Sequence, residues 1–89
     1  MEFEYDPVKS QSNKLKHGID FDAIQELWLD QGYVQVPART IDEPRFIVIG
    51  RCAGKTWSCV ITYREQVIRI ISARRARLEE VELYERERL

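Results

Sequence analysis

The stretch IRIISARRA, residues 68–76, decides how the C-terminal half of this chain folds. Ile68, Ile70 and Ile71 are β-branched and favour a strand with a packed face. Ser72 is a typical helix N-cap, because its hydroxyl accepts a hydrogen bond from an amide of the first helical turn. Strong helix formers follow it. We therefore predict a buried strand over residues 67–72 that runs directly into a helix over residues 73–87.

The same stretch concentrates positive charge. Arg69, Arg74 and Arg75 lie close together in the sequence, and planar guanidinium groups match the geometry of phosphate. The whole chain has 14 basic and 15 acidic residues, a formal net charge of −1, which is unusual for a protein that binds nucleic acid. Residues 9–17 and 69–77, however, hold basic side chains and no acidic ones. The chain can therefore present a basic face despite its near-neutral total.

The remaining patterns predict an α+β fold. A short strand is expected at residues 3–5, and a helix follows that Asp6 caps and that ends before Gly18. A second helix begins after Asp20 and ends at Gly32. The apolar period then changes to two, which predicts strands at residues 33–39, 45–52, 56–64 and 67–72. The order β-α-α-β-β-β-β-α is typical of a twisted antiparallel sheet with helices packed on it.

Length and composition set further limits. A chain of 89 residues makes one small domain, which we take as residues 1–89, and 44% hydrophobic residues suffice for a core. No stretch resembles a signal peptide or a membrane span, so we expect a soluble, cytoplasmic protein without membrane contact. Cys52 and Cys59 should be reduced. We expect no metal site and no cofactor, because neither a ligand spacing nor an acidic cluster is apparent.

Three motifs resemble the signatures of one family, BrnT, and occur in the same order. The resemblance covers nearly the whole chain, and the N-terminal motif is an Asp-Pro-x-Lys followed by Asn-x-x-Lys-His-Gly-(hydrophobic)-x-Phe. The motifs are YDPVKSQSNKLKHGIDF at residues 5–21, the pairs Glu43-x-Arg45 and Gly50-Arg51, and RIISARRA at residues 69–76 with Glu80 and Tyr84 after it.

The resemblance implies both a fold and a function. BrnT proteins are RelE-like ribonuclease toxins of bacterial type II toxin–antitoxin systems, and they inhibit translation and growth. Their partner antitoxin, BrnA, neutralises them and is a DNA-binding repressor. By resemblance we expect an RNA substrate, a BrnA-like antitoxin, a heterotetramer with it, and contact with operator DNA only through the antitoxin.

Cleavage of RNA without a metal needs a base for the 2′-OH proton, cations for the phosphorane and an acid for the 5′-oxygen that leaves. Arg69 and Arg74 are the best candidates for the cations, since one stands on a strand face and the other at a predicted helix start. Arg45 opens a strand at the family's Glu-x-Arg position. Its alternative role is an ion pair with Glu43.

Proton transfer has three candidates. His17 is the residue type that most readily exchanges a proton near neutral pH, although a helix C-cap beside Gly18 also explains its position. Glu80 could act as a base or pair with an arginine. Tyr84 resembles the tyrosine that some RelE-like toxins place near the scissile phosphate, and its alternative role is to anchor the last helix on the sheet.

Four residues are candidates for holding the RNA backbone. Lys9, Asn13 and Lys16 have the spacing i, i+4, i+7, which is one stripe of a helix and equally suits a solvated surface. Arg75 can bind phosphate or pair with Glu79 at i+4 of the predicted helix.

The most concrete reading is a metal-independent endoribonuclease toxin. The alternative is a non-catalytic module of the same fold, either an RNA-binding protein or an antitoxin-bound corepressor. The near-neutral charge slightly favours this alternative. So does Val81, since the family usually has a basic residue directly after the glutamate at this point of the last helix.

Overall fold

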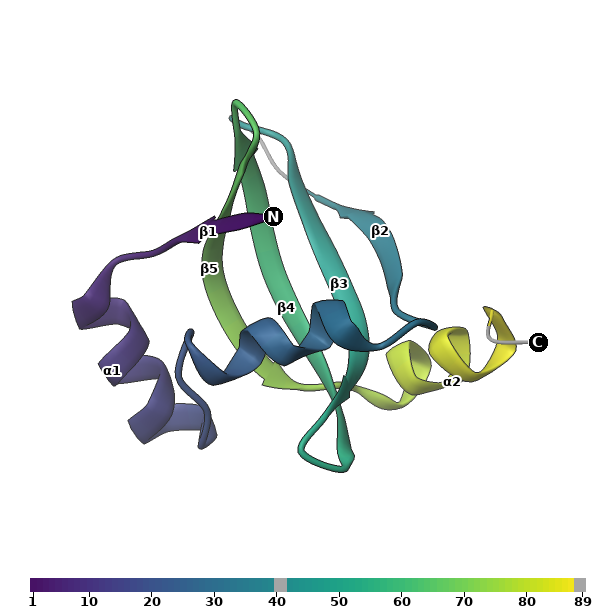
Figure 1. Ribbon diagram of the computed structural model, residues 1–89. Coiled ribbons are helices and arrows are strands. Elements are labelled where there is room, and N and C mark those ends of the chain that lie inside the picture. The colour runs from purple at the N-terminus through teal and green to yellow at the C-terminus, as the bar shows by residue number, and fades with distance from the viewer. Residues whose placement is uncertain (40–41, 88–89) are drawn as a thin grey trace.

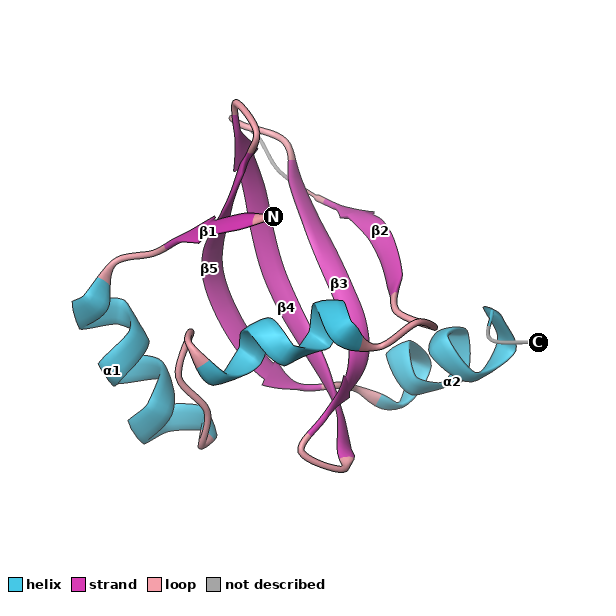
Figure 2. Cartoon of the chain, in the orientation of Figure 1, coloured by secondary structure: helices cyan, strands magenta, loops and turns pink. Residues whose placement is uncertain are grey.

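The computed structural model describes residues 1–39 and 42–87 and contains one five-stranded sheet with helices around it (Figure 1, Figure 2). The elements are β1 (Glu2–Glu4), α1 (Pro7–His17), the 3₁₀ helix η1 (Ala23–Leu29), β2 (Val34–Ala38), β3 (Arg45–Cys52), β4 (Lys55–Arg64), β5 (Val67–Arg75) and α2 (Leu78–Glu87). Their order agrees with the predicted order, and the α+β class is confirmed.

The sheet is mixed rather than wholly antiparallel. Its strand order is β1-β5-β4-β3-β2, and β2 to β5 form the expected antiparallel meander. β1 pairs with β5 in parallel, with Phe3 opposite Ile68, so the prediction of an all-antiparallel sheet is wrong at this edge. No tight turn joins β1 to β5, because α1, η1 and β2 to β4 lie between them in the chain, so their pairing is not restricted to the antiparallel direction of a hairpin (Figure 1).

The predicted boundary between the last strand and the last helix is also wrong. β5 continues to Arg75, and Ser58 and Trp57 of β4 pair with Arg74 and Arg75. Ser72 is therefore a strand residue and not a helix cap. Ladder hydrogen bonds to β4 and the complete burial of Ala73 outweigh the helix propensity of this segment, which is worth only tenths of a kcal/mol per residue.

The predicted ends of α1 are confirmed. The Asp6 carboxylate accepts a hydrogen bond from Val8 N at 2.9 Å, which satisfies one free amide of the first turn. Gly18 follows the helix with φ of 85°, a left-handed conformation that glycine adopts without strain, and its N–H donates to Lys14 O.

The second helix is shorter than predicted at both ends: it begins at Ala23, with Asp22 at the N-cap position, and not directly after Asp20. The Asp20 carboxylate accepts hydrogen bonds from Asp22 N and Ala23 N, at 3.1 and 2.8 Å. The element is a 3₁₀ helix that ends at Leu29 rather than at Gly32. Asp30 ends it, because the backbone leaves the helical region there and Asp30 N donates to Leu27 O.

The core lies between η1 and one face of the sheet. Figure 1 shows η1 crossing in front of the central strands. Ile24 and Leu27 are completely buried there. Gly50 of β3 allows the close approach, because an added Cβ would lie 3.3 Å from Leu27 Cδ2 and 3.2 Å from Tyr33 Cβ. The core side chains that the strands contribute include Val48, Cys59, Ile61, Ile70 and Ala73.

Candidate nucleic-acid interface

Asn13 fastens α1 to the edge of β5. Its Nδ2 donates to Ile19 O at 2.8 Å and to Ala73 O at 2.9 Å, and its Oδ1 accepts from Ala73 N at 3.2 Å. β1 covers only residues 67–69 of this edge, so the Asn13 amide takes the place of a neighbouring strand at Ala73. Asn13 is 7% exposed. The residue predicted to contact RNA is thus buried and serves to hold α1.

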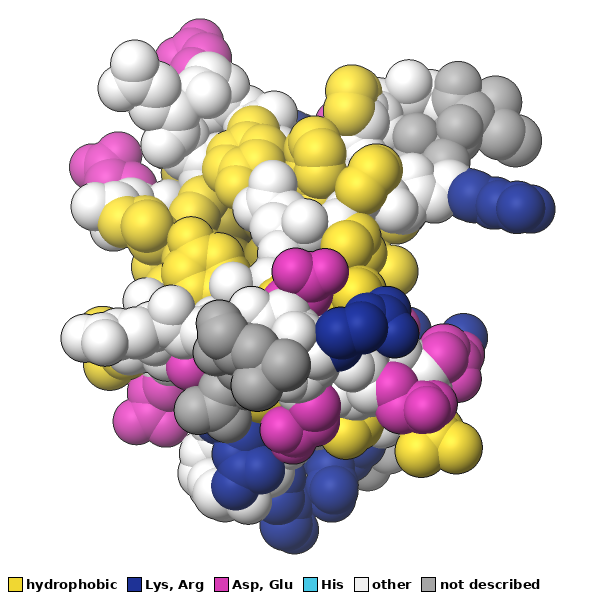
Figure 3. All heavy atoms as spheres, turned by 90° about the vertical axis from the view of Figure 1, so that its right-hand side faces the viewer, with side chains coloured by type: hydrophobic (Ala, Val, Ile, Leu, Met, Phe, Trp, Pro, Cys, Tyr) yellow, Lys and Arg dark blue, Asp and Glu magenta, His cyan; other side chains and the backbone are white. Residues whose placement is uncertain are grey.

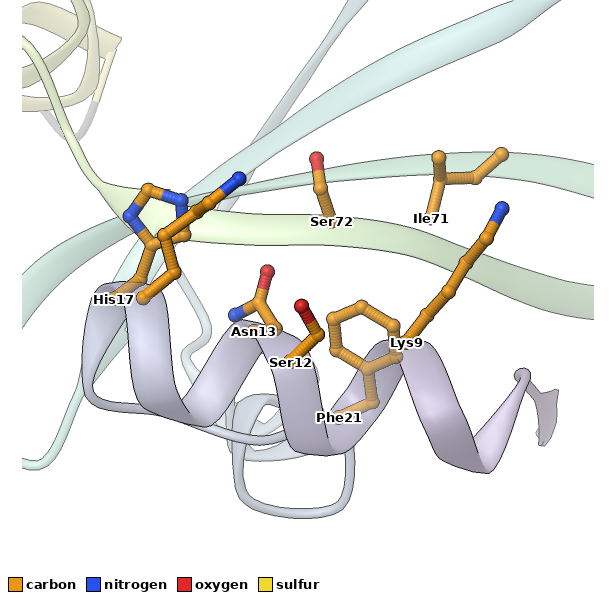
Figure 4. A pocket seen from close by; sticks show the side chains of 8 residues that line it. Lys9, Ser12, Asn13, His17, Phe21, Ile71 and Ser72 are labelled. Atoms are coloured by element: carbon orange, nitrogen blue, oxygen red, sulfur yellow. The ribbon is translucent and has the colours of Figure 1, made fainter.

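A groove runs between α1 and β5 and has a volume of about 260 Å³. In Figure 4, Lys9 and His17 extend from α1 on either side of Ser72, which points from β5 to the same side as Ile71. Since an α-helix rises about 1.5 Å per residue, Lys9 and His17 stand about 12 Å apart along α1. The α1–β5 groove is lined by Lys9, Ser12, Asn13, Lys16, His17, Phe21, Ile71 and Ser72.

A second pocket of about 130 Å³ continues this groove. The two hollows share Lys9 and Ile71, so they form one path along the edge of the sheet. Four cationic and two acidic side chains line the pocket, which is therefore basic on balance. We call it the arginine pocket; its lining is Asp6, Lys9, Glu43, Arg45, Arg64, Arg69, Ile70 and Ile71.

Arg69 stands at the arginine pocket and is paired. Its Nη1 donates to Glu4 Oε2 at 2.6 Å, and the side chain is 26% exposed. Arg45 opens β3 as predicted. Arg45 does not form the alternative ion pair with Glu43. The Glu43 carboxylate pairs instead with Arg64, with Oε2 4.0 Å from Arg64 Nη2. Sequence reasoning missed Arg64, because only the pairing of β4 with β5 brings it to this pocket.

A β-bulge decides which arginines share a face. Ile61 pairs with Ile70 and Val60 with Ser72, so Ile71 is an extra residue in β5. Simple alternation would put Arg69 and Arg74 on opposite faces, and the extra residue puts them on the same one. They still lie about 13 Å apart, four residues of β4 at about 3.3 Å each.

Arg74 belongs to a tight polar cluster with Glu80. The two side chains form a bidentate pair, with nitrogen–oxygen distances of 2.7 and 2.9 Å. The Glu80 carboxylate also accepts hydrogen bonds from Ser58 Oγ at 2.9 Å and from Arg77 N at 2.8 Å. Burial alone would raise the pKa of Glu80, but the hydrogen bonds from Arg74, Arg77 and Ser58 lower it to about 2. Such a carboxylate is a weak base at neutral pH.

Tyr84 is completely buried and anchors α2. Its hydroxyl donates to Asp30 Oδ2 at 2.6 Å. Asp30 also accepts from Gly32 N and from Arg51 N, each at 2.8 Å, so one carboxylate joins α2 to η1 and β3. The geometry matches the anchoring alternative for Tyr84. Sequence reasoning missed Asp30, although Asp-x-Gly is a recognisable turn signal.

Arg75 lies on the opposite face from Arg74. Its guanidinium sits 5.6 Å from the centre of the Trp57 ring, a cation–π distance. The predicted pairing of Arg75 with Glu79 on a helix is wrong, because Arg75 belongs to β5 and successive strand residues point to opposite sides. The arginines of residues 69–75 therefore do not converge on a single phosphate.

The two cysteines are free thiols, as predicted, and lie away from the groove. Burial, together with the carboxylate of Glu26, which accepts a hydrogen bond from Cys52 Sγ at 3.5 Å, raises the pKa of Cys52 to about 11. Burial also raises the pKa of Cys59. Neither thiol is a nucleophile at neutral pH.

The chain is a small α+β domain with a groove and a basic pocket along one edge of its sheet. A family model described as "Ribonuclease toxin, BrnT, of type II toxin-antitoxin system" matches residues 5–80. The chain therefore belongs to the BrnT family of ribonuclease toxins, which confirms the resemblance in the sequence. A type II family implies an antitoxin partner and an RNA target. Comparison with curated proteins gave no match.

Two further observations bear on partners and ligands. No helix within residues 1–39 and 42–87 is long and apolar enough to cross a membrane. In the same residues, His, Cys, Asp and Glu side chains form no group of three or more that could hold a metal ion.

Proposed function

We propose that this chain is a metal-independent endoribonuclease whose RNA strand lies along the α1–β5 groove and the arginine pocket. The observation that carries the proposal is the continuity of the two hollows through Lys9 and Ile71. It gives an RNA strand a cationic path with a histidine at one end and arginines at the other. The RelE-like character of the fold is part of the proposal and rests on the resemblance.

In this proposal the α1–β5 groove and the arginine pocket have different roles. At one end, His17 exchanges the proton of the 2′-OH or of the leaving 5′-oxygen, and Lys16 beside it offsets charge on the phosphorane. At the other end, Lys9, Arg45 and Arg69 hold a phosphate further along the strand, because guanidinium groups bind phosphate through two parallel hydrogen bonds. A single strand that fills the path meets both ends at once.

The α2 residues have a positioning role in the same scheme. Glu80 is held ionised by Arg74, and Tyr84 is buried against Asp30, so neither side chain meets a substrate in the groove. Arg74 lies two residues beyond Ser72 on the same face. We propose that it supports the His17 end of the groove through its pair with Glu80.

The proposed partner is a BrnA-like antitoxin that binds the toxin as a heterotetramer in the cytoplasm. Operator DNA is contacted through the antitoxin alone. Free toxin then cleaves RNA and inhibits translation and growth, and the complex represses its own operon.

The second candidate is the non-catalytic module. One observation favours it: Arg69 and Arg74, the two arginines expected to meet the scissile phosphate, are both paired with carboxylates in the free protein. Such a protein would bind RNA or the antitoxin and leave RNA intact.

Cleavage of end-labelled RNA by purified, antitoxin-free toxin tests the two candidates. With EDTA present, we expect cleavage and 2′,3′-cyclic phosphate ends. His17→Gln should slow cleavage roughly 100-fold or more, the usual contribution of a general acid or base. Arg86→Ala is the matched control, since this exposed cation lies on α2 outside the groove. Intact RNA would support the module, and cleavage only with added metal would end the metal-independent proposal.

A further inference from the structure

The sheet face opposite η1 carries a row of aliphatic side chains that no described helix covers. Val36 pairs with Ile47 and Ile47 with Val60, so this row crosses β2, β3 and β4, and Ser72 of β5 lies beside Val60. Val36, Ile47 and Val60 are all half-buried. Val48 and Cys59, their neighbours on the core face, are completely buried. We call Val36, Ile47 and Val60 the aliphatic row.

The covering by α2 stops one step short of this row. Ile49 and Ser58, two residues along β3 and β4, are buried, and Glu80 of α2 accepts the Ser58 hydroxyl. Ile47 and Val60 are the next residues on this face and are only half-buried. Figure 3, seen from the β2 side, shows hydrophobic side chains gathered in the upper part of the view, and charged ones dominate the lower part, where α2 lies.

Positive charge borders the row on the side away from α2. Arg45 lies two residues before Ile47 on the same strand and face, and Arg69 pairs with Thr62, two residues after Val60. Both line the arginine pocket. The row is therefore an apolar surface with a cationic border along one side, and the complementary ligand has an apolar stripe with acidic side chains along one side of it.

The shape of the row favours a helix as that ligand. Strands lie about 4.8 Å apart, so Val36 and Val60 are about 10 Å apart, close to the rise of seven helical residues. Addition of a strand at the β2 edge is less suited, because Pro37 lacks an N–H. RNA is also a poor match, since the aliphatic row offers bases no aromatic ring to stack on.

We propose that the aliphatic row docks an amphipathic, acidic-flanked helix of the antitoxin, whose carboxylates reach Arg45 and Arg69. The inference rests on the proposed function and deepens it: the antitoxin neutralises the toxin by occupying the arginine end of the RNA path. Membership of a type II family supplies the partner, and the charge pattern supplies its chemistry.

The test is titration of the purified toxin with the antitoxin from its own operon. Val36→Glu places a charge three strands from the groove, and it should weaken antitoxin binding at least tenfold and leave RNA cleavage within about threefold of wild type. Val36→Thr keeps the β-branched shape and should weaken binding about threefold. Leu29→Glu is the matched control, because Leu29 is 80% exposed on η1, on the other side of the sheet.

The outcomes separate this inference from the proposed function. Thermal unfolding checks that each variant is folded. If Val36→Glu does not fold, the antitoxin affinity of Val36→Thr decides the test. Unchanged antitoxin affinity in both Val36 variants would overturn the docking surface even if RNA is cleaved. Weakened affinity together with intact RNA would support the docking surface and overturn the ribonuclease proposal alone.

Discussion

At the scale of single residues, Asn13 shows why a polar side chain on a helix stripe need not face a ligand. Its amide has both a donor and an acceptor, so it can bond the N–H and the C=O of one strand residue, and it does so at Ala73. Lysine could not replace it, because an ammonium group has no acceptor. Lys9, Asn13 and Lys16 lie on one face of α1, as their spacing predicts, and Asn13 fastens that face to the sheet.

Asn13→Ala should lower the free energy of unfolding by about 2–4 kcal/mol, because buried carbonyl and amide groups lose their partners. Urea unfolding measures this loss. Hydrogen exchange of the Ala73 amide should also become faster.

Ser12→Ala is the control for this substitution, since Ser12 lines the same groove and is exposed. A variant of Asn13 as stable as this control, but with weaker RNA binding, would mean that Asn13 is an RNA contact after all.

At the scale of elements, α2 depends on two polar contacts more than on its apolar stripe. Leu78 is 74% exposed, whereas Glu80 and Tyr84 carry the hydrogen bonds to β4, β5 and η1. The ionised Glu80 is bound by Arg74, so its charge contributes to the stability of the docked helix.

Glu80→Gln should lower the free energy of unfolding by about 2 kcal/mol at neutral pH, allowing for solvent screening of this partly exposed pair. The folded-state pKa of about 2 lies below the ordinary value of 4.5. The stabilisation is therefore complete above about pH 4.5 and is lost as the pH falls toward 2.

Chemical unfolding at several pH values measures this dependence, with the exposed neighbour variant Glu79→Gln as the control. The difference between wild type and Glu80→Gln should shrink below pH 4.5. A difference that stays constant down to pH 2 would show that the Glu80 charge does not stabilise α2.

At the scale of the whole molecule, charge is separated although the total is near zero. The cations of α1, β3 and β5 line the proposed RNA path, and five of the 15 acidic side chains lie on α2. Binding of a single RNA strand should then depend on salt in proportion to the phosphates that these cations neutralise.

We expect the logarithm of the affinity for uncleavable 2′-O-methyl RNA to fall with the logarithm of salt concentration with a slope of about −1.4, since each neutralised phosphate contributes about −0.7. Lys16 neutralises one phosphate at the His17 end of the path, and Lys9, Arg45 and Arg69 neutralise one at the other end. Lys16→Ala should make the slope about 0.7 shallower. Lys14→Ala is the matched control, since Lys14 lies on α1 but does not line the groove. Equal slopes for Lys16→Ala and Lys14→Ala would mean that RNA binds outside the α1–β5 groove.

The sequence alone determined those features that depend on a few neighbouring residues. Asp6 and Gly18 mark the two ends of α1, Asp20 stabilises the turn before η1, and an apolar period of two marks β3 and β4. These signals act through local hydrogen bonds and local burial, and here tertiary contacts agree with them, whereas at Ser72 the pairing of β5 with β4 overrides the local helix signal. The motifs also pointed to the family that the chain belongs to.

Only the tertiary structure decided where β5 ends, how β1 pairs and which way each arginine points. These features depend on the register between segments far apart in the chain. One extra residue at Ile71 exchanges the two faces of β5 beyond it, and the exchange puts Arg74 beside Glu80 and Arg75 on Trp57. A bulge has no local sequence signature here, so no reading of the chain alone could have assigned the partners of these side chains.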